Sequence, residues 1–378
     1  MSLHGELIGL RRQSFRQLLL GIAVTVTPAA FAPAIMSTGS AVGIAATVTT
    51  IGALSVPVSA NAGQSDTSGQ SKDLVKSDPQ HLLQEMVMAM ESLNFIGEFV
   101  HVMDSKLEAM RIVHASTPEG ELERLTSLNG EAREIFRDDE KLICILPGSN
   151  SLVVASSKDR QTIPRIDAEV LQSEFYESMH EGFDRVAGRD AHVISIMPVD
   201  QFRYGHKFWI DTDSKMLLRM TLLGESGGVM DQFMFTSIEF PESIDESIFD
   251  TSQAENAVEL PDRKPAHAAS ASLQSDGPVV SFNTLPGGYR KVAESYDPMP
   301  ISDAPVSHIT ISDGMASVSV YVEYSANPDL EESSFGMSSM GAINAYTRKD
   351  GDTVVTVVGE VPAAVIKDIS QSIVVNAN

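Results

Sequence analysis

The chain contains little cysteine, little tryptophan and few basic side chains. Its 378 residues include 1 Cys, 1 Trp and 27 Lys plus Arg, against 51 Asp plus Glu. The single cysteine, Cys144, excludes an intrachain disulfide and a thiolate metal site. The net charge of -24 repels nucleic acid, so we expect no nucleic-acid partner. The histidines are scattered, without H-E-x-x-H or paired spacing, and we predict no metal and no cofactor.

The N-terminus has the pattern of an export leader. Arg11, Arg12 and Arg16 precede an apolar stretch, and the next charged residue is Asp66. Small-residue cleavage patterns end at Ala60 and Ala62. We therefore predict a signal peptide over 1–60, a polar tether over 61–76 and a periplasmic location. The alternative is an uncleaved anchor, because the leader contains two apolar stretches. No cysteine follows the leader, which excludes a lipid-anchored form.

The rest of the chain has the length and apolar content of two folded units, since 43% of its residues are hydrophobic. Asp78 and Pro79 predict the start of an amphipathic helix. From Phe95 onward, apolar residues recur at every second position instead of at helical spacing. This alternation predicts an antiparallel meander, with one helical interruption around 169–179. The predicted strands are 95–102, 110–115, 122–128, 133–137, 142–146, 151–155, 192–197, 206–211, 215–223 and 229–240.

The last strands of this meander carry large apolar side chains on both faces. Such a sheet is covered on both sides or curves around helices or an apolar ligand. We therefore name a candidate lipid-binding set: Phe208, Trp209, Leu218, Met220, Phe233 and Phe235. The alternative for each of these residues is ordinary core packing.

Proline and small residues over 251–277 predict a linker. It separates a first domain, 77–250, from a smaller second domain, 278–378. In the second domain we expect strands at 307–312, 316–324, 342–348 and 353–359, followed by a terminal helix that starts at Pro362.

Ser226 lies in a G-x-S-x-G sequence, the pattern of the serine-hydrolase elbow. That elbow requires a strand that leads into a helix, whereas both neighbours here are predicted strands. The glycines are typical of a hairpin turn. We therefore predict a protein that binds other molecules and is not an enzyme.

Several segments together resemble one family, the RseB/MucB regulators of the envelope-stress sigma factor (sigma-E/AlgU). The similar segments occur in family order and cover about residues 78–375. They are 128–134 (LNGEARE), 188–189 (GR), 203–211 (RYGHKFWID), 231–233 (DQF), 285–289 (LPGGY), 312–320 (SDGMASVSV) and 357–362 (VVGEVP).

The resemblance implies an α+β, mostly antiparallel β fold. The first domain would be a bent half-barrel of the LolA/LolB type with helices in its concavity, and the second a smaller β-sheet domain with a terminal helix. It also implies a regulator that binds the periplasmic domain of a RseA/MucA-type anti-sigma factor and protects it from site-1 proteolysis. Lipid or lipoprotein acyl chains would release that hold. Homo-oligomerisation stays open, and the runner-up function is a periplasmic carrier of lipids or lipoproteins.

Overall fold

The computed structural model describes residues 78–103, 106–138, 141–145, 152–155, 173–251, 258–260, 278–299, 302–324 and 335–376. The predicted leader and tether lie outside these residues. In the described part of the chain, neither helix is long and apolar enough to cross a membrane.

The first unit is one large sheet. Its order is β12-β6-β5-β4-β3-β2-β1-β11-β10-β9-β8-β7. All neighbouring strands pair antiparallel except β12 with β6. The strands are β1 (Phe95–Met103), β2 (Lys106–Thr117), β3 (Gly120–Ser127), β4 (Glu134–Arg137), β5 (Lys141–Ile145), β6 (Leu152–Ala155), β7 (Tyr176–Val186), β8 (Arg189–Pro198), β9 (Gly205–Asp211), β10 (Leu217–Leu223), β11 (Val229–Glu239) and β12 (Val258–Leu260). A 3-10 turn, η2 (Glu246–Phe249), follows β11.

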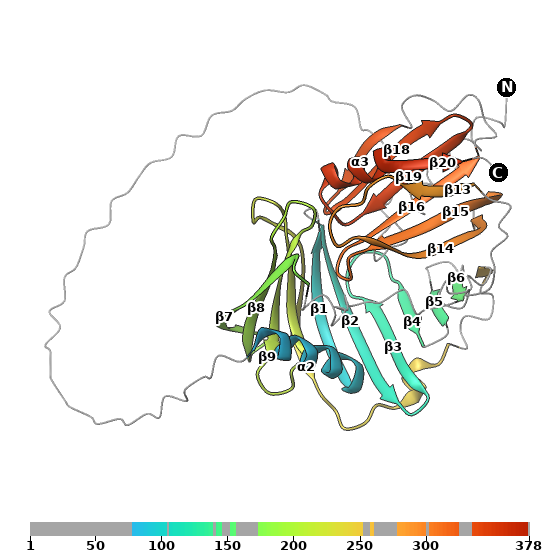
Figure 1. Ribbon diagram of the computed structural model, residues 1–378. Helices are drawn as coiled ribbons and strands as arrows, with labels where there is room; N and C mark the ends of the chain where they lie inside the picture. The colour runs from blue at the N-terminus through green and yellow to red at the C-terminus, as the bar shows by residue number, and fades with distance from the viewer. Residues whose placement is uncertain are drawn as a thin grey trace, which may run out of the picture.

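The sheet is curved, and helix α2 (Pro79–Ser92) lies across its concave face (Figure 1). The helix starts as predicted, because the Asp78 side chain accepts a hydrogen bond from the Gln80 N–H and Pro79 occupies the first turn. Its apolar side, including Leu83 and Met86, joins the core formed by the strands. This arrangement confirms the predicted fold class, with one helix in the concavity among the described residues.

The second unit is a sheet of order β14-β15-β16-β19-β18-β17, accompanied by a two-stranded ribbon and a helix. Its elements are β13 (Val279–Phe282), β14 (Arg290–Met299), β15 (Ser302–Ser312), β16 (Ser317–Tyr324), β17 (Gly336–Met340), β18 (Ile343–Asp350), β19 (Thr353–Gly359), α3 (Ala363–Ser372) and β20 (Ile373–Asn376). Helix α3 packs on one face of the sheet through Val365, Ile366 and Ile369. This unit therefore has its own core.

The prediction was wrong in one place within the first unit. The expected helical interruption at 169–179 is in part strand β7, which pairs with β8 along its whole length, and 169–172 lie outside the described residues. Leu171, Phe175 and Met179 have helical spacing, but pairing at the sheet edge outweighs that local pattern. The segment predicted as linker also contains β12, which extends the first sheet next to β6.

Ser226 lies in the turn that joins β10 to β11. The Gly224 N–H donates to the Gly228 carbonyl at 2.9 Å, and Gly227 has a φ of 75°. A hairpin between two strands is the predicted alternative to a hydrolase elbow. The elbow geometry that would expose a nucleophilic serine is not present at this position.

Candidate functional site: the junction between the two units

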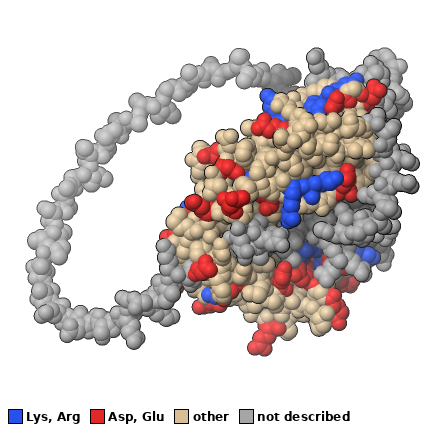
Figure 2. Space-filling view, viewed as in Figure 1, with Lys and Arg blue, Asp and Glu red and all other residues tan. Residues whose placement is uncertain are grey.

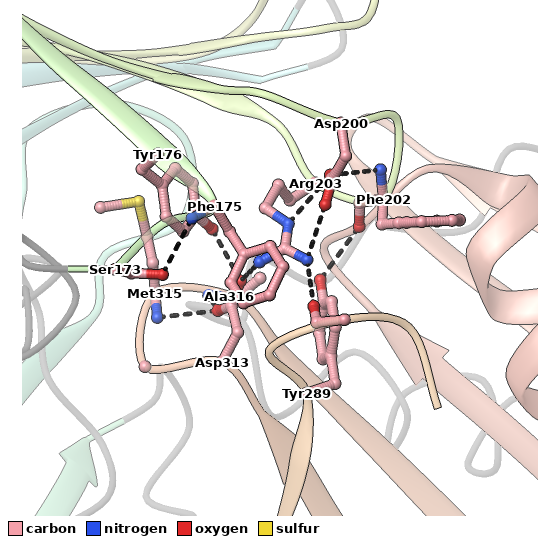
Figure 3. Close-up of polar contacts among 12 residues, drawn as sticks. Ser173, Phe175, Tyr176, Asp200, Phe202, Arg203, Tyr289, Asp313, Met315 and Ala316 are labelled. Carbon is pink, nitrogen blue, oxygen red and sulfur yellow. Dashed lines mark hydrogen bonds and ion pairs between the residues drawn. The ribbon is translucent and has the colours of Figure 1, made fainter. Parts of the chain in front are cut away.

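The most conspicuous polar cluster joins the two units, and Arg203 lies at its centre (Figure 3). This arginine precedes β9, in the segment of the sequence with the strongest family resemblance. Its Nη1 donates to Asp313 Oδ2 at 2.7 Å, and its Nη2 donates to the Gly287 carbonyl, both in the second unit. Its Nε donates to Asp200 Oδ1 at 3.1 Å within the first unit. One guanidinium therefore holds groups from both units.

The ion pair between Arg203 and Asp313 is buried. The side chains are 0% and 2% exposed, respectively. The guanidinium also lies over the rings of Phe175, Tyr176 and Tyr289, at 4.8, 5.4 and 5.0 Å from their centroids. A buried charge is tolerated only when it is paired and hydrogen-bonded, and this site supplies both conditions.

Asp313 lies in the tight turn between β15 and β16. Its Oδ1 accepts from the backbone N–H groups of Met315 and Ala316, at 3.0 and 2.7 Å, so the carboxylate fixes its own turn. Its Oδ2 accepts from Arg203 and also from the Tyr176 hydroxyl at 2.9 Å. Burial, together with the neighbouring Asp313 carboxylate, raises the pKa of Tyr176 far above its ordinary value. Tyr176 therefore remains a hydrogen-bond donor.

Each unit also inserts an apolar side chain into the other. Phe202 packs against the core of the second unit, and Met315 packs against the core of the first. The Tyr289 hydroxyl donates to the Phe202 carbonyl at 3.0 Å, which fixes that segment on the second unit. The contact is therefore both polar and apolar.

Two glycines allow this close approach. A Cβ on Gly287 would lie 2.8 Å from the Phe175 ring, and one on Gly288 would lie 2.7 Å from it. Gly288 also has a φ of 82°, which side chains other than glycine rarely adopt. The segment 285–289 thus has its two glycines because a ring from the other unit occupies the space.

A second contact lies beside the first. Tyr204 packs with Leu222 of β10 and Ala342 of the second unit. The Asn344 Nδ2 donates to the Tyr204 hydroxyl at 3.2 Å and to the Val361 carbonyl at 2.8 Å. Adjacent residues Arg203 and Tyr204 therefore both hold the second unit.

The remaining residues of the 203–211 segment serve the first unit. Asp211 accepts from Arg189 at 2.8 Å and from the Ser214 hydroxyl, which closes the turn after β9. The His206 ring is stacked on Phe208, and burial lowers its pKa to about 4, so the ring is neutral at neutral pH. The start of this segment, Arg203 and Tyr204, therefore contacts the second unit, and the rest of the segment belongs to the first unit.

The six candidate lipid-binding residues are all buried, with exposed fractions from 0% to 8%. Phe208 pairs with Met220, and Met220 pairs with Phe233, so these three share one face of the sheet. Phe233 and Phe235 meet edge to face at 5.1 Å, and Leu218 lies at a bulge beside Met220. All six candidates, Trp209 included, belong to the same hydrophobic cluster as α2.

Trp209 points to the opposite face of the sheet. It pairs with Arg219, whose guanidinium lies 4.1 Å from the ring centroid, and its Nε1 donates to Asp184 at 2.9 Å. Trp209 therefore projects from the opposite face of the sheet to its neighbour Phe208, as the alternation of strand residues requires.

Acidic side chains are spread over the visible surface of both units, and basic ones are fewer (Figure 2). Two of the partly exposed basic residues, Arg189 and Lys207, are in ion pairs. The surface visible in Figure 2 is therefore predominantly acidic.

Comparison with known proteins places both units in one family. A family model described as the MucB/RseB N-terminal domain matches residues 78–253, and one described as the MucB/RseB C-terminal domain matches residues 276–374. The sigma factor AlgU regulatory protein MucB of Pseudomonas aeruginosa is 30% identical, over 79% of this chain and 91% of its own. The sigma-E factor regulatory protein RseB of Haemophilus influenzae is 27% identical, over 77% and 89%.

Solved structures agree with this placement. MucB in the complex of Pseudomonas aeruginosa MucA and MucB superposes with a TM-score of 0.61 at 25% identity, covering 80% of this chain and 100% of that one. A crystal structure of MucB alone gives a TM-score of 0.54 at 25% identity, over 78% and 97%. The matched share of this chain, 78–80%, is larger than either unit alone.

Proposed function

This chain belongs to the MucB/RseB family, and from that premise we propose that it binds the periplasmic region of a membrane anti-sigma factor of the RseA/MucA type. The bound region would be protected from site-1 proteolysis, which would restrain the envelope-stress response. The proposal includes a periplasmic location and a role without catalysis. The observation that carries it is the junction: the family motifs of both units converge on Arg203, which holds them in one arrangement.

A carrier of lipids or lipoproteins is less well supported. A carrier needs only the curved sheet and its concave face, whereas here the second unit is joined to the first by a buried ion pair and exchanged side chains. A partner that contacts both units would recognise their fixed relative orientation. We therefore propose that the junction presents a composite surface to the anti-sigma factor.

The protective role is tested by proteolysis. A purified anti-sigma periplasmic segment is exposed to the site-1 protease, alone or with a molar excess of this protein. We expect the cleavage rate to fall in proportion to the fraction of the segment that is bound, because the protease cannot reach a bound segment. Serum albumin at the same concentration is the control for general crowding. An unchanged cleavage rate would contradict the protective role.

We also propose that acyl chains bind the concave face at Phe208, Leu218, Met220, Phe233 and Phe235. Helix α2 packs on this face, so an acyl chain that enters must displace apolar side chains of α2. Trp209 belonged to the predicted set, but it faces away from this site. It therefore provides a matched control rather than a contact.

The predicted result is a contrast between two variants in titrations with a long-chain fatty acid. Met220→Gln places a polar amide in the apolar site and should weaken binding by about tenfold or more, since burying an unpaired amide costs roughly 1–3 kcal/mol. Trp209→Phe, on the other face, should leave the affinity unchanged. Isothermal titration calorimetry measures both. Equal losses in the two variants, or none in either, would remove the acyl site from the concave face.

A further inference from the structure

A cluster of metal-ligating side chains lies at the β2–β3 hairpin, at the end of the first sheet remote from the second unit (Figure 1). Ligand atoms of His114, Glu121 and Glu123 all lie within 4.8 Å of one another. The antiparallel register causes this: His114 is directly opposite Glu123, and Glu121 is two residues along the same face. The residues are therefore close because of strand pairing rather than a contiguous motif.

One nitrogen of the histidine has a defined role. His114 Nδ1 lies 2.8 Å from the Leu93 carbonyl oxygen, which can only accept a hydrogen bond, so Nδ1 carries the proton. The ring is stacked on Phe95, with centroids 4.7 Å apart. Nε2 is thus the nitrogen that offers a lone pair. A histidine fixed by a backbone carbonyl through its other nitrogen is the usual arrangement of a metal ligand.

The two carboxylates are held in place by hydrogen bonds from Arg137. Arg137 donates to both oxygens of Glu123, at 2.9 and 2.7 Å, and to Glu121 Oε2 at 3.1 Å. A carboxylate oxygen has two lone pairs, so it can accept from Arg137 and still coordinate a cation. Arg137 also compensates one of the two negative charges. The two carboxylates and the Arg137 guanidinium together leave one net negative charge, which favours a divalent cation.

We propose that His114, Glu121 and Glu123 form a binding site for a divalent transition metal of the Zn²⁺ class. One imidazole and two carboxylates are ligands that Zn²⁺ accepts, whereas Mg²⁺ prefers all-oxygen sites that retain several waters. The site departs from the expectation that the chain holds no metal. It lies at the end of the first sheet away from the domain junction (Figure 1), so its test is separate from that of the proposed anti-sigma role. The bound ion would cross-link the hairpin and, through His114, the end of helix α2.

The test is isothermal titration of the exported chain, without a polyhistidine tag, with Zn²⁺ and separately with Mg²⁺. We expect one Zn²⁺ per chain and markedly weaker binding of Mg²⁺. Glu121→Gln removes one ligand charge at a partly exposed position and should weaken Zn²⁺ binding by about tenfold or more. His114→Gln should weaken it at least as much. His81→Gln is the matched control, because His81 lies beside Glu85 on the surface of α2 and outside the site.

Because His114 is buried, His114→Gln could unfold the protein. In that case the Zn²⁺ affinity of Glu121→Gln is the test of the site. A rise in the melting temperature with Zn²⁺ that is lost in Glu121→Gln and retained in His81→Gln supports the site through a second readout. The proposal is overturned by absence of Zn²⁺ binding, by equal binding in the wild type and Glu121→Gln, or by loss of binding in His81→Gln alone.

Discussion

Replacement of Arg203 by Ala should destabilise the protein by about 3–5 kcal/mol, because it leaves a buried carboxylate without its partner. Asp313 is 2% exposed and would keep only the Tyr176 hydroxyl and its own turn as donors. Three aromatic rings would also lose the cation that they surround. Equilibrium unfolding in urea measures the loss, and Arg185→Ala, at an exposed arginine of the same sheet, is the control.

Two further variants separate the charge from the shape. Arg203→Lys keeps the charge but cannot supply the forked donors that reach Asp313, Gly287 and Asp200 together, so it should rescue little of the loss. Arg203→Met combined with Asp313→Asn removes both charges but keeps a side-chain oxygen that can accept from the turn N–H groups of Met315 and Ala316, and it should be more stable than Arg203→Met alone. If all of these variants unfold like the wild type, the buried pair does not hold the two units together.

The second large effect is expected at Gly288. Gly288→Ala combines a strained φ of 82° with a Cβ 2.7 Å from the Phe175 ring, so the loss should be about 2–5 kcal/mol from strain and overpacking together. Gly130→Ala is a control for strain alone, because Gly130 has a φ of 70° and nothing within 4 Å of the added Cβ. Gly287→Ala is a control for overlap alone. Urea unfolding of the three variants measures the separate contributions.

A rescue experiment completes this comparison. Phe175→Leu should restore most of the stability lost in Gly287→Ala, because it removes the atoms that the new Cβ meets. It should restore only part of the loss in Gly288→Ala, where the backbone strain remains. Equal losses in Gly130→Ala and Gly288→Ala would mean that Phe175 makes no close contact at the junction.

Most of the first sheet could be predicted from the sequence. The strands β1 to β5 follow from apolar alternation and from turn signals such as Asn129-Gly130, and α2 follows from its cap at Asp78. The edge strand β7 could not be predicted, since Phe175 and Met179 have a helical spacing and only pairing with β8 determines the outcome. Strands β13, β14, β17 and β20 of the second unit were also missed; β13 and β20 consist of four residues each and pair only with each other.

The sequence identified the segments of the junction but not their meeting. Arg203 is separated from Gly287 by 84 residues and from Asp313 by 110, and no local pattern links positions so far apart. Two features of the sequence pointed to the junction. One is the family resemblance of the three segments, and the other is the adjacent pair Gly287 and Gly288, which lies outside the predicted strands and helices. The direction of Trp209 follows from the sequence, since it alternates with Phe208 along one strand.

We expect the chain to bind an anti-sigma periplasmic segment through two units held in one arrangement. The most direct measurement is the dissociation constant for that segment, by isothermal titration calorimetry, with wild type, Gly287→Ala and Gly130→Ala. We predict one segment per chain for the wild type, affinity weaker by about tenfold or more for Gly287→Ala, and unchanged affinity for Gly130→Ala. No binding by the wild type, or equal binding by all three proteins, would contradict the account.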